Sequence, residues 1–134
     1  MKLNFLLTLN AILFIGAGIA FALYGPLMIA VFGILEVVGD SPMYWYAASF
    51  ARMFGAALFG FGFLLFALRR SSSSAVDQGT GRGTLTALVL SYLLASIVAL
   101  TQQVSIWGSL AGWITVALCL LLLIGYAYFL LKPA

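Results

Sequence analysis

The stretch "YWYAASFARMFGAALFGFGFLLFALRR", residues 44–70, is almost entirely apolar and ends at a pair of arginines. It is longer than the about 20 residues that a helix needs to cross the hydrocarbon core of a bilayer. The aromatic residues at its start and the arginines at its end are typical of the two interfaces that flank a membrane span. The stretch therefore predicts a transmembrane helix over residues 43–69.

One residue in this helix, Arg52, does not fit an apolar span. It precedes Arg69 by a distance of roughly 25 Å along a helix. A charge at that depth needs an acidic partner, or it must reach the headgroups with its flexible side chain. Glu36 and Asp40 are the acidic residues expected on the same side, and we expect an ion pair between Arg52 and Glu36. Two alternatives stay open, in which Arg52 only reaches the headgroups or binds an anionic headgroup or carboxylate.

The composition of the whole chain agrees with this interpretation. Of its 134 residues, 65% are hydrophobic and 7% are charged, a balance that is typical of membrane proteins. We expect an all-α bundle of four transmembrane helices, at about residues 4–24, 43–69, 85–102 and 108–131. These helices leave no room for a soluble domain, so residues 1–134 are predicted to form one transmembrane domain.

The connections between the helices also have distinct sequences. Gly25 and Pro26 interrupt the first span, and the apolar segment 26–38 is too short to cross, so we expect an interfacial helix there. Pro42 favours a new helix start. The polar residues 70–84 predict a cytoplasmic linker. We expect the first span to be retained, because its cleavage as a signal peptide would leave the basic linker on the wrong side.

The charges predict the orientation of the bundle. The net charge is +3, and most basic residues lie at the ends of spans rather than in one patch, which argues against nucleic-acid binding. The positive-inside rule places the linker and both termini in the cytoplasm. We therefore expect an integral protein of the bacterial cytoplasmic (inner) membrane, with its N and C termini inside.

Small residues recur along the predicted helices at spacings that favour close helix packing. The residues expected to form these packing faces are Gly16, Ala20, Ala51, Gly55, Ala87, Ser91, Ala95, Ala99 and Gly112. A monomeric bundle and a homo-oligomer could both use such faces, and both stay open.

The chain offers few groups for chemistry. It has no histidine and a single cysteine, Cys119, so we expect no catalytic residues, no metal site and no cofactor. Among the polar residues inside the spans, Asn10 and Tyr92 could meet across the first and third helices. The candidate ligand-binding residues are thus Arg52, Glu36, Asn10 and Tyr92.

Several segments together resemble a known type of protein. These are "LTLNAILF" (7–14), the Gly-Pro break followed by "VFGI" (31–34), "ARMFGAALFGFGFLLFALR" (51–69) and "GWITVALCLLLLIGYAYFL" (112–130). The pattern is similar to small uncharacterised bacterial four-helix membrane proteins of a loosely DoxX-like kind, and its most specific part is Arg52 with Gly55. The resemblance implies a four-helix bundle with both termini inside, and it implies no particular activity.

The leading functional hypothesis is a non-enzymatic membrane protein that works by binding, as an accessory subunit of a membrane complex or as a lipid-contacting partner. The alternative is a carrier or channel element for a small anionic or amphipathic molecule, with Arg52 at its outer mouth. An enzyme acting on lipids would require Glu36, Asp40 and Arg52 to converge on one outer pocket. The expected partner is the lipid bilayer, with a membrane protein complex or a homo-oligomer as further candidates, and no nucleic acid.

Overall fold

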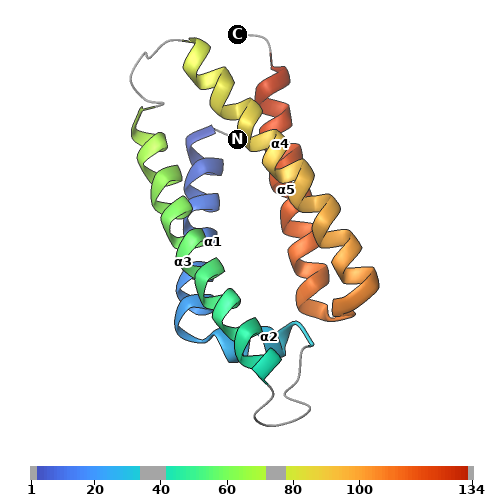
Figure 1. The fold of residues 1–134 in the computed structure, drawn as a ribbon. Helices are drawn as coiled ribbons and strands as arrows, with labels where there is room; N and C mark the ends of the chain where they lie inside the picture. Colours follow the sequence, from blue (N-terminus) through green and yellow to red (C-terminus); the bar gives the residue numbers. More distant parts are fainter. Residues whose placement is uncertain (1–2, 34–41, 72–77, 133–134) are drawn as a thin grey trace.

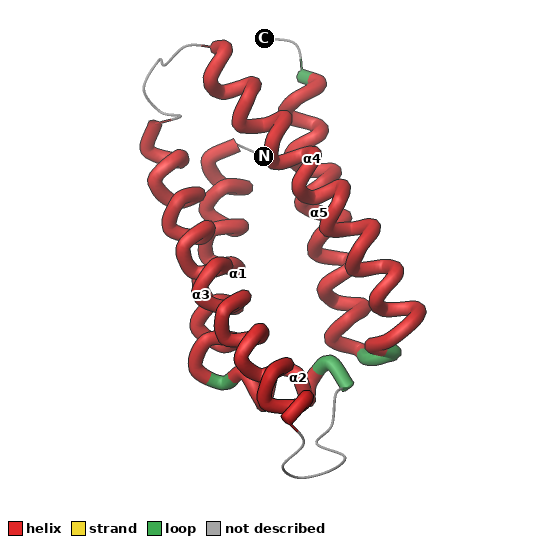
Figure 2. Tube along the Cα trace, in the orientation of Figure 1, coloured by secondary structure: helices red, strands yellow, loops and turns green. Residues whose placement is uncertain are grey.

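The structure is a computed structural model that describes residues 3–33, 42–71 and 78–132. The described chain is helical apart from short turns (Figure 2). In chain order the elements are α1 (Leu3–Leu23), α2 (Gly25–Val31), α3 (Pro42–Ser71), α4 (Gln78–Gln102), the π-helical turn η1 (Gln103–Trp107) and α5 (Leu110–Leu131). Four of these helices, namely α1, α3, α4 with η1, and α5, are long and apolar enough to cross a membrane, which confirms the predicted all-α, four-span fold class.

The four spans form two helical hairpins (Figure 1). Helix α1 packs along α3 in the first hairpin, and α4 packs along α5 in the second, whereas the chief helix contact between the hairpins is that of α1 with α5. Both chain termini, the end of α3 and the start of α4 lie at one end of the molecule, and α2 and η1 lie at the other. The first end is called the terminal end below, and the second the α2 end.

Glycines allow the close packing of the first hairpin. A Cβ atom at Gly18 would lie 2.6 Å from the Phe59 backbone nitrogen, and one at Gly55 would lie 2.8 Å from the Gly18 carbonyl oxygen. Gly62 packs in the same way against Ile15. Since real Cβ atoms do not approach backbone atoms so closely, only glycine lets the two backbones touch, as in other small-residue contacts between membrane helices.

The second hairpin turns through η1. Gly108 ends this turn with φ 57°, in the left-handed region that glycine adopts without strain. Ser109 then caps α5, because its hydroxyl accepts a hydrogen bond of 3.2 Å from the Gly112 backbone N–H. The side chain of Gln103 is buried against Gly112 and donates from Nε2 to the Ser109 carbonyl oxygen at 3.0 Å.

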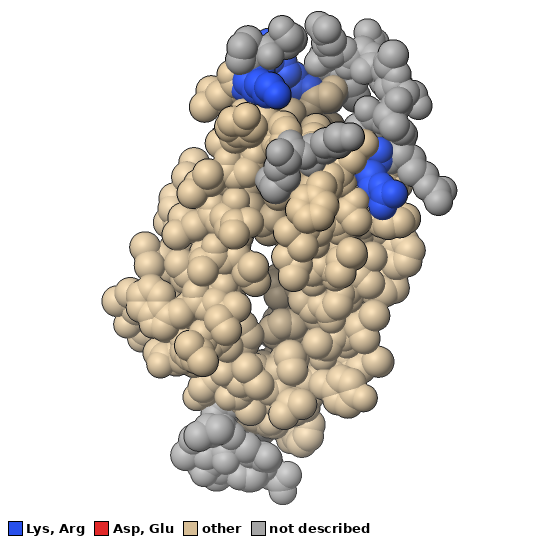
Figure 3. Space-filling view, turned by 180° about the vertical axis from the view of Figure 1, so that it is seen from behind, with Lys and Arg blue, Asp and Glu red and all other residues tan. Residues whose placement is uncertain are grey.

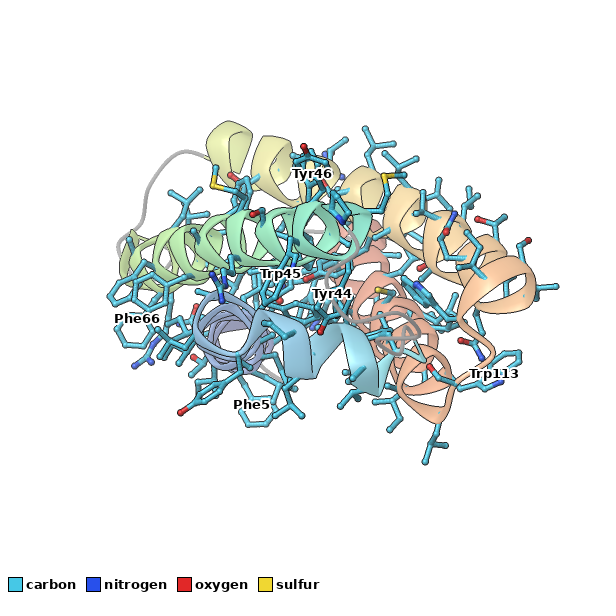
Figure 4. All side chains as sticks on the ribbon, turned by 60° about the horizontal axis from the view of Figure 1, so that its bottom comes forward. Phe5, Tyr44, Trp45, Tyr46, Phe66 and Trp113 are labelled. Carbon is cyan, nitrogen blue, oxygen red and sulfur yellow. The ribbon has the colours of Figure 1, made fainter. Side chains whose placement is uncertain are left out.

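Helix α2 packs against the start of α3. Ile29 of α2 is buried with Ala48 and Ala51 of α3, and Tyr44 packs against them. Figure 4 shows Tyr44 between α3 and α2, while Tyr46 points away from the helices. The aromatic residues that begin α3 are thus divided between packing and the outer surface.

Three predicted boundaries need correction. The predicted linker 70–84 is too long, because α4 already begins at Gln78. Extending an existing helix adds a backbone hydrogen bond per residue, which offsets the about 1 kcal/mol cost of a glycine in a helix. The last span begins at Leu110 rather than at residue 108, because Gly108 and Ser109 form the turn and the cap. The predicted segment 26–38 is helical at Gly25–Val31, and its residues 34–38 lie outside the described part.

The predicted packing faces are correct only in part. Ala51, Gly55, Ala99 and Gly112 are buried, and Ala20 and Ala95 are half-buried, but Gly16, Ala87 and Ser91 face outward. The buried face of α4 is instead formed by Tyr92, Ser96 and Ala99, followed by Gln103 in η1. On α4, the buried residues Tyr92 and Ser96 each come one position after a predicted packing residue, whereas Ala99 is buried as predicted.

The close contact at Gly55 predicts that Gly55→Ala destabilises the protein by about 1–3 kcal/mol, the usual cost of adding a methyl group to a packed site. The matched control is Gly60→Ala on the same helix, because a Cβ atom there would have no neighbour within 4 Å. The control should be neutral or slightly stabilising, since alanine favours the helix. Unfolding of both variants in detergent measures the difference, and equal stability would contradict the assigned role of Gly55.

Candidate functional site at the contact between the hairpins

Three polar side chains from three helices meet between the hairpins. The Tyr92 hydroxyl of α4 donates to Asn10 Oδ1 of α1 at 2.7 Å, and Asn10 Nδ2 donates to the Tyr126 hydroxyl of α5 at 2.8 Å. The two tyrosine rings are stacked, with centroids 5.7 Å apart and an interplanar angle of 20°. We call these three residues the polar triad. The expected meeting of Asn10 and Tyr92 is confirmed by their hydrogen bond.

The polar triad is fully enclosed by apolar side chains. Asn10 and Tyr126 are 0% exposed and Tyr92 is 5% exposed. The apolar residues of this core are Leu6, Leu7, Ala11, Leu65 and Leu122, which come from α1, α3 and α5. In such surroundings an unpaired amide or hydroxyl is costly, so the two hydrogen bonds specify how the helices are placed against one another.

Helix α1 also approaches α5 closely at this level. A Cβ atom at Gly125 would lie 2.9 Å from Leu6 Cδ2, so the absent side chain makes room for the Leu6 side chain beside Tyr126. Phe14 lies farther along α1, with its ring centroid 6.3 Å from that of Tyr92. The polar triad and these apolar contacts form the first junction between the hairpins.

A second junction lies at the α2 end. The Phe32 and Trp107 rings meet edge to face at a centroid distance of 4.9 Å. Gly33, with φ 89°, passes so close to Trp107 that a Cβ atom would lie 2.9 Å from its carbonyl oxygen. The space-filling view shows openings that pass through the molecule between its terminal end and its α2 end (Figure 3). We call this opening between the hairpins the interhairpin window.

Arg52 lies away from this region. Its Cγ would be 3.0 Å from a Cβ atom at Gly25, so its aliphatic stem crosses the break between α1 and α2. Around α3, Arg52 is rotated by roughly 140° from Leu65, which belongs to the core with the polar triad. Arg52 is exposed, and no described residue accepts a hydrogen bond from it.

The predicted ligand-binding residues therefore do not form one site. Asn10 and Tyr92 lie together, but Arg52 lies beside Gly25, roughly 20 Å away along α1. Glu36 and Asp40 are outside the described residues, so the expected ion pair with Arg52 stays a prediction. The arrangement gives the protein a neutral polar centre inside the bundle and a separate cation on the outside of the first hairpin.

Most other polar side chains in the spans bond to their own helix. The Ser96 hydroxyl donates to the Tyr92 carbonyl oxygen at 2.7 Å, and the Thr115 hydroxyl donates to that of Ala111 at 2.9 Å. These bonds pair intramembrane hydroxyls with the backbone of their own helix. The side chains that the sequence analysis missed are Tyr126 and Gln103. A tyrosine within an apolar span is the signal for the first, because a buried phenol requires a partner, but the exposed Tyr128 on the same helix gives the same signal.

Comparisons with known protein families, with curated proteins and with solved structures found no match to this chain. The resemblance to DoxX-like proteins therefore stays a prediction.

The polar triad predicts a graded response to substitution. Tyr92→Phe and Tyr126→Phe should each cost about 0.5–2 kcal/mol of stability, the range found for interhelical hydrogen bonds in membranes. Asn10→Leu should cost more than either, because it leaves two buried hydroxyls without their partner. Tyr128→Phe is the matched control, since Tyr128 is exposed on the same helix as Tyr126.

Unfolding in detergent, combined into a double-mutant cycle of Asn10 with Tyr126, measures this coupling. Additive effects of the two substitutions would contradict the hydrogen-bonded triad.

Proposed function

We propose that this chain is a non-enzymatic integral protein of the bacterial cytoplasmic membrane, which works by binding within the bilayer. Its partner is a membrane lipid or another membrane protein, to which it serves as an accessory subunit. The observation that supports this proposal is the interhairpin window, because the described helices of the two hairpins contact each other much less than the helices within each hairpin do, which leaves intramembrane surface for another molecule. Most of each span also faces outward, where lipids or a partner would contact it.

The proposed orientation rests on the basic residues. The Lys and Arg side chains visible in Figure 3 gather at the terminal end of the molecule. Arg69 near the end of α3, Arg82 near the start of α4 and Lys132 after α5 belong to this end. By the positive-inside rule, the terminal end faces the cytoplasm, and α2 lies as an interfacial helix on the opposite side.

This orientation predicts that a fluorescent protein fused to the C-terminus folds in the cytoplasm and fluoresces in cells. The complementary fusion joins a periplasmic phosphatase to a chain that ends at Gly33, after α2, and the phosphatase should be active because the proposed orientation puts α2 on the other side. Phosphatase activity from a C-terminal fusion, without fluorescence from its counterpart, would reverse the orientation.

A carrier with Arg52 at its outer mouth is less well supported. Such a path would connect the cation with the polar centre, but Arg52 lies over Gly25 on a different side of α3 from Leu65. The two hypotheses therefore differ in what the loss of Arg52 does to binding.

Native mass spectrometry of the protein released in a gentle detergent tests the proposal. We expect the wild type to retain a lipid or a protein partner, and we expect Arg52→Ala to retain the same molecule, because Arg52 lies on a different side of α3 from Leu65, which belongs to the core between the hairpins. Arg82→Ala is the control for loss of a charge, since Arg82 is exposed near the terminal end. Loss of the bound molecule from Arg52→Ala alone would favour the carrier. A wild type that retains neither a lipid nor a partner would contradict the proposed function.

A further inference from the structure

The turn between α4 and α5 holds a buried amide whose hydrogen bonding is incomplete. The Gln103 side chain is 2% exposed, and its Nε2 donates to the Ser109 carbonyl oxygen at 3.0 Å. Its Oε1 has no hydrogen-bond partner in the described part of the chain and lies against Gly112. A buried acceptor that gives up water and gains no donor destabilises the arrangement that buries it. This arrangement of the turn therefore carries a cost, which ends when Oε1 reaches water.

The absence of a side chain at Gly112 allows the amide to lie there. An added Cβ atom at Gly112 would overlap Oε1 of Gln103, and it would lie 3.1 Å from Trp107 Cε3. The amide thus occupies the space that a side chain at this position would need, and Trp107 borders the same space. The backbone carbonyl oxygen of Gln103 also accepts from the Gly108 N–H at 3.1 Å. The buried amide and the π-helical backbone of η1 are therefore held together as one unit.

Trp107 connects this unit to the first hairpin through a series of aromatic rings. Its ring centroid is 4.9 Å from that of Phe32, and the Phe32 centroid is 6.0 Å from that of Phe21 in α1. Phe21 in turn meets Phe54 of α3 edge to face at a centroid distance of 5.6 Å. The rings of these four residues form a continuous series of contacts from α3 to η1. The position of Trp107 decides whether the second hairpin belongs to this series.

The turn η1 lies at a level where water is available. The span Gly81–Trp107 ends in this turn and the span Leu110–Leu131 begins just after it, so a bilayer that the spans cross would leave the turn at its surface. The polar triad lies deeper, with Tyr92 roughly 16 Å from Gln103 along the helix axis. A small rotation of the second hairpin about the polar triad would therefore separate the rings at η1 and let water reach Gln103 Oε1.

We propose that Gln103 and Trp107 form a latch, which closes the α2 end of the two hairpins and opens by rotation about the polar triad. In the closed form, which is the form described above, Trp107 contacts Phe32 and Gln103 Oε1 is unpaired. In the open form the ring contact is lost and Oε1 is hydrated. These two changes have opposite signs and similar sizes in free energy, so both forms are populated. The inference goes beyond the proposed function, because it concerns how the hairpins separate and not what they bind.

Fluorine NMR of Trp107 tests whether both forms exist. The chain has three tryptophans, and the exposed Trp45 and Trp113 can be replaced by phenylalanine, so that fluorotryptophan labels Trp107 alone. We expect one resonance for the closed form and another for the open form. Phe32→Leu identifies the closed form, because removing the Phe32 ring changes the shielding of Trp107 only while the two rings are in contact.

Gly112→Ala in this labelled protein tests the part played by the amide. Its methyl group overlaps the Gln103 amide in the closed form only. The ratio of open to closed form should rise by roughly 5-fold to 150-fold, which is the usual penalty of an added methyl group expressed as a ratio of populations. The double variant Gln103→Ala/Gly112→Ala removes the overlapped amide and should restore the closed resonance. Gly60→Ala is the matched control, because a Cβ atom there would have no neighbour within 4 Å.

Each outcome decides the inference. A shift to the open form in Gly112→Ala that the double variant reverses supports the latch. A single resonance that Gly112→Ala leaves in place overturns it, and so does a shift that the double variant does not reverse, because the amide would then not hold the turn. If Gly112→Ala does not fold, relaxation dispersion of the labelled parent protein decides alone, since a single resonance without exchange shows one rigid form. Failure of the latch leaves the proposed function standing, because Trp107 reports the position of a ring and not the binding of a partner.

Discussion

The structure depends on one constraint, which is that polar groups inside a membrane must be satisfied within the protein. Continuous helices meet this requirement for the backbone, and hydroxyls such as those of Ser96 and Thr115 meet it by donating to their own helix. The side chain of Asn10 does not bond to its own helix in this way. Its hydrogen bonds in the described structure go to Tyr92 and Tyr126 of the second hairpin. The need to pair this one amide therefore fixes where the two hairpins meet.

Packing within each hairpin then explains why the hairpins meet only in places. Gly18, Gly55 and Gly62 allow the backbones of α1 and α3 to touch, so these helices stay close along their length. Fewer contacts join the two hairpins. Phe14 packs against Tyr92 of the second hairpin, whereas Phe21 packs against Phe32 and Phe54 of the first. The two hairpins are therefore in less close contact with each other than α1 and α3 are within the first hairpin.

The sequence was sufficient for the features that composition and chemistry determine. Four apolar segments with charged ends predict four spans, and the scarcity of polar groups predicts that Asn10 and Tyr92 meet. Helix faces were harder to predict, as the outward positions of Gly16, Ala87 and Ser91 show. In helices that are apolar on every side, the contrast between a lipid-facing and a buried face is weak, so small residues alone do not identify the packing face. Tyr126 was missed for the same reason, because nothing in its neighbours distinguishes an inward from an outward tyrosine.

The separation of charged and neutral groups limits what such a bundle can bind inside the membrane. A charged ligand between the hairpins would need an opposite charge on the walls, since uncompensated ions are costly in hydrocarbon. Arg52 lies beside Gly25, on a different side of α3 from Leu65 of the core. The amide and hydroxyls of the polar triad are fully enclosed and already bonded to one another. An uncharged molecule between the hairpins would therefore meet a lower cost in free energy than a charged one.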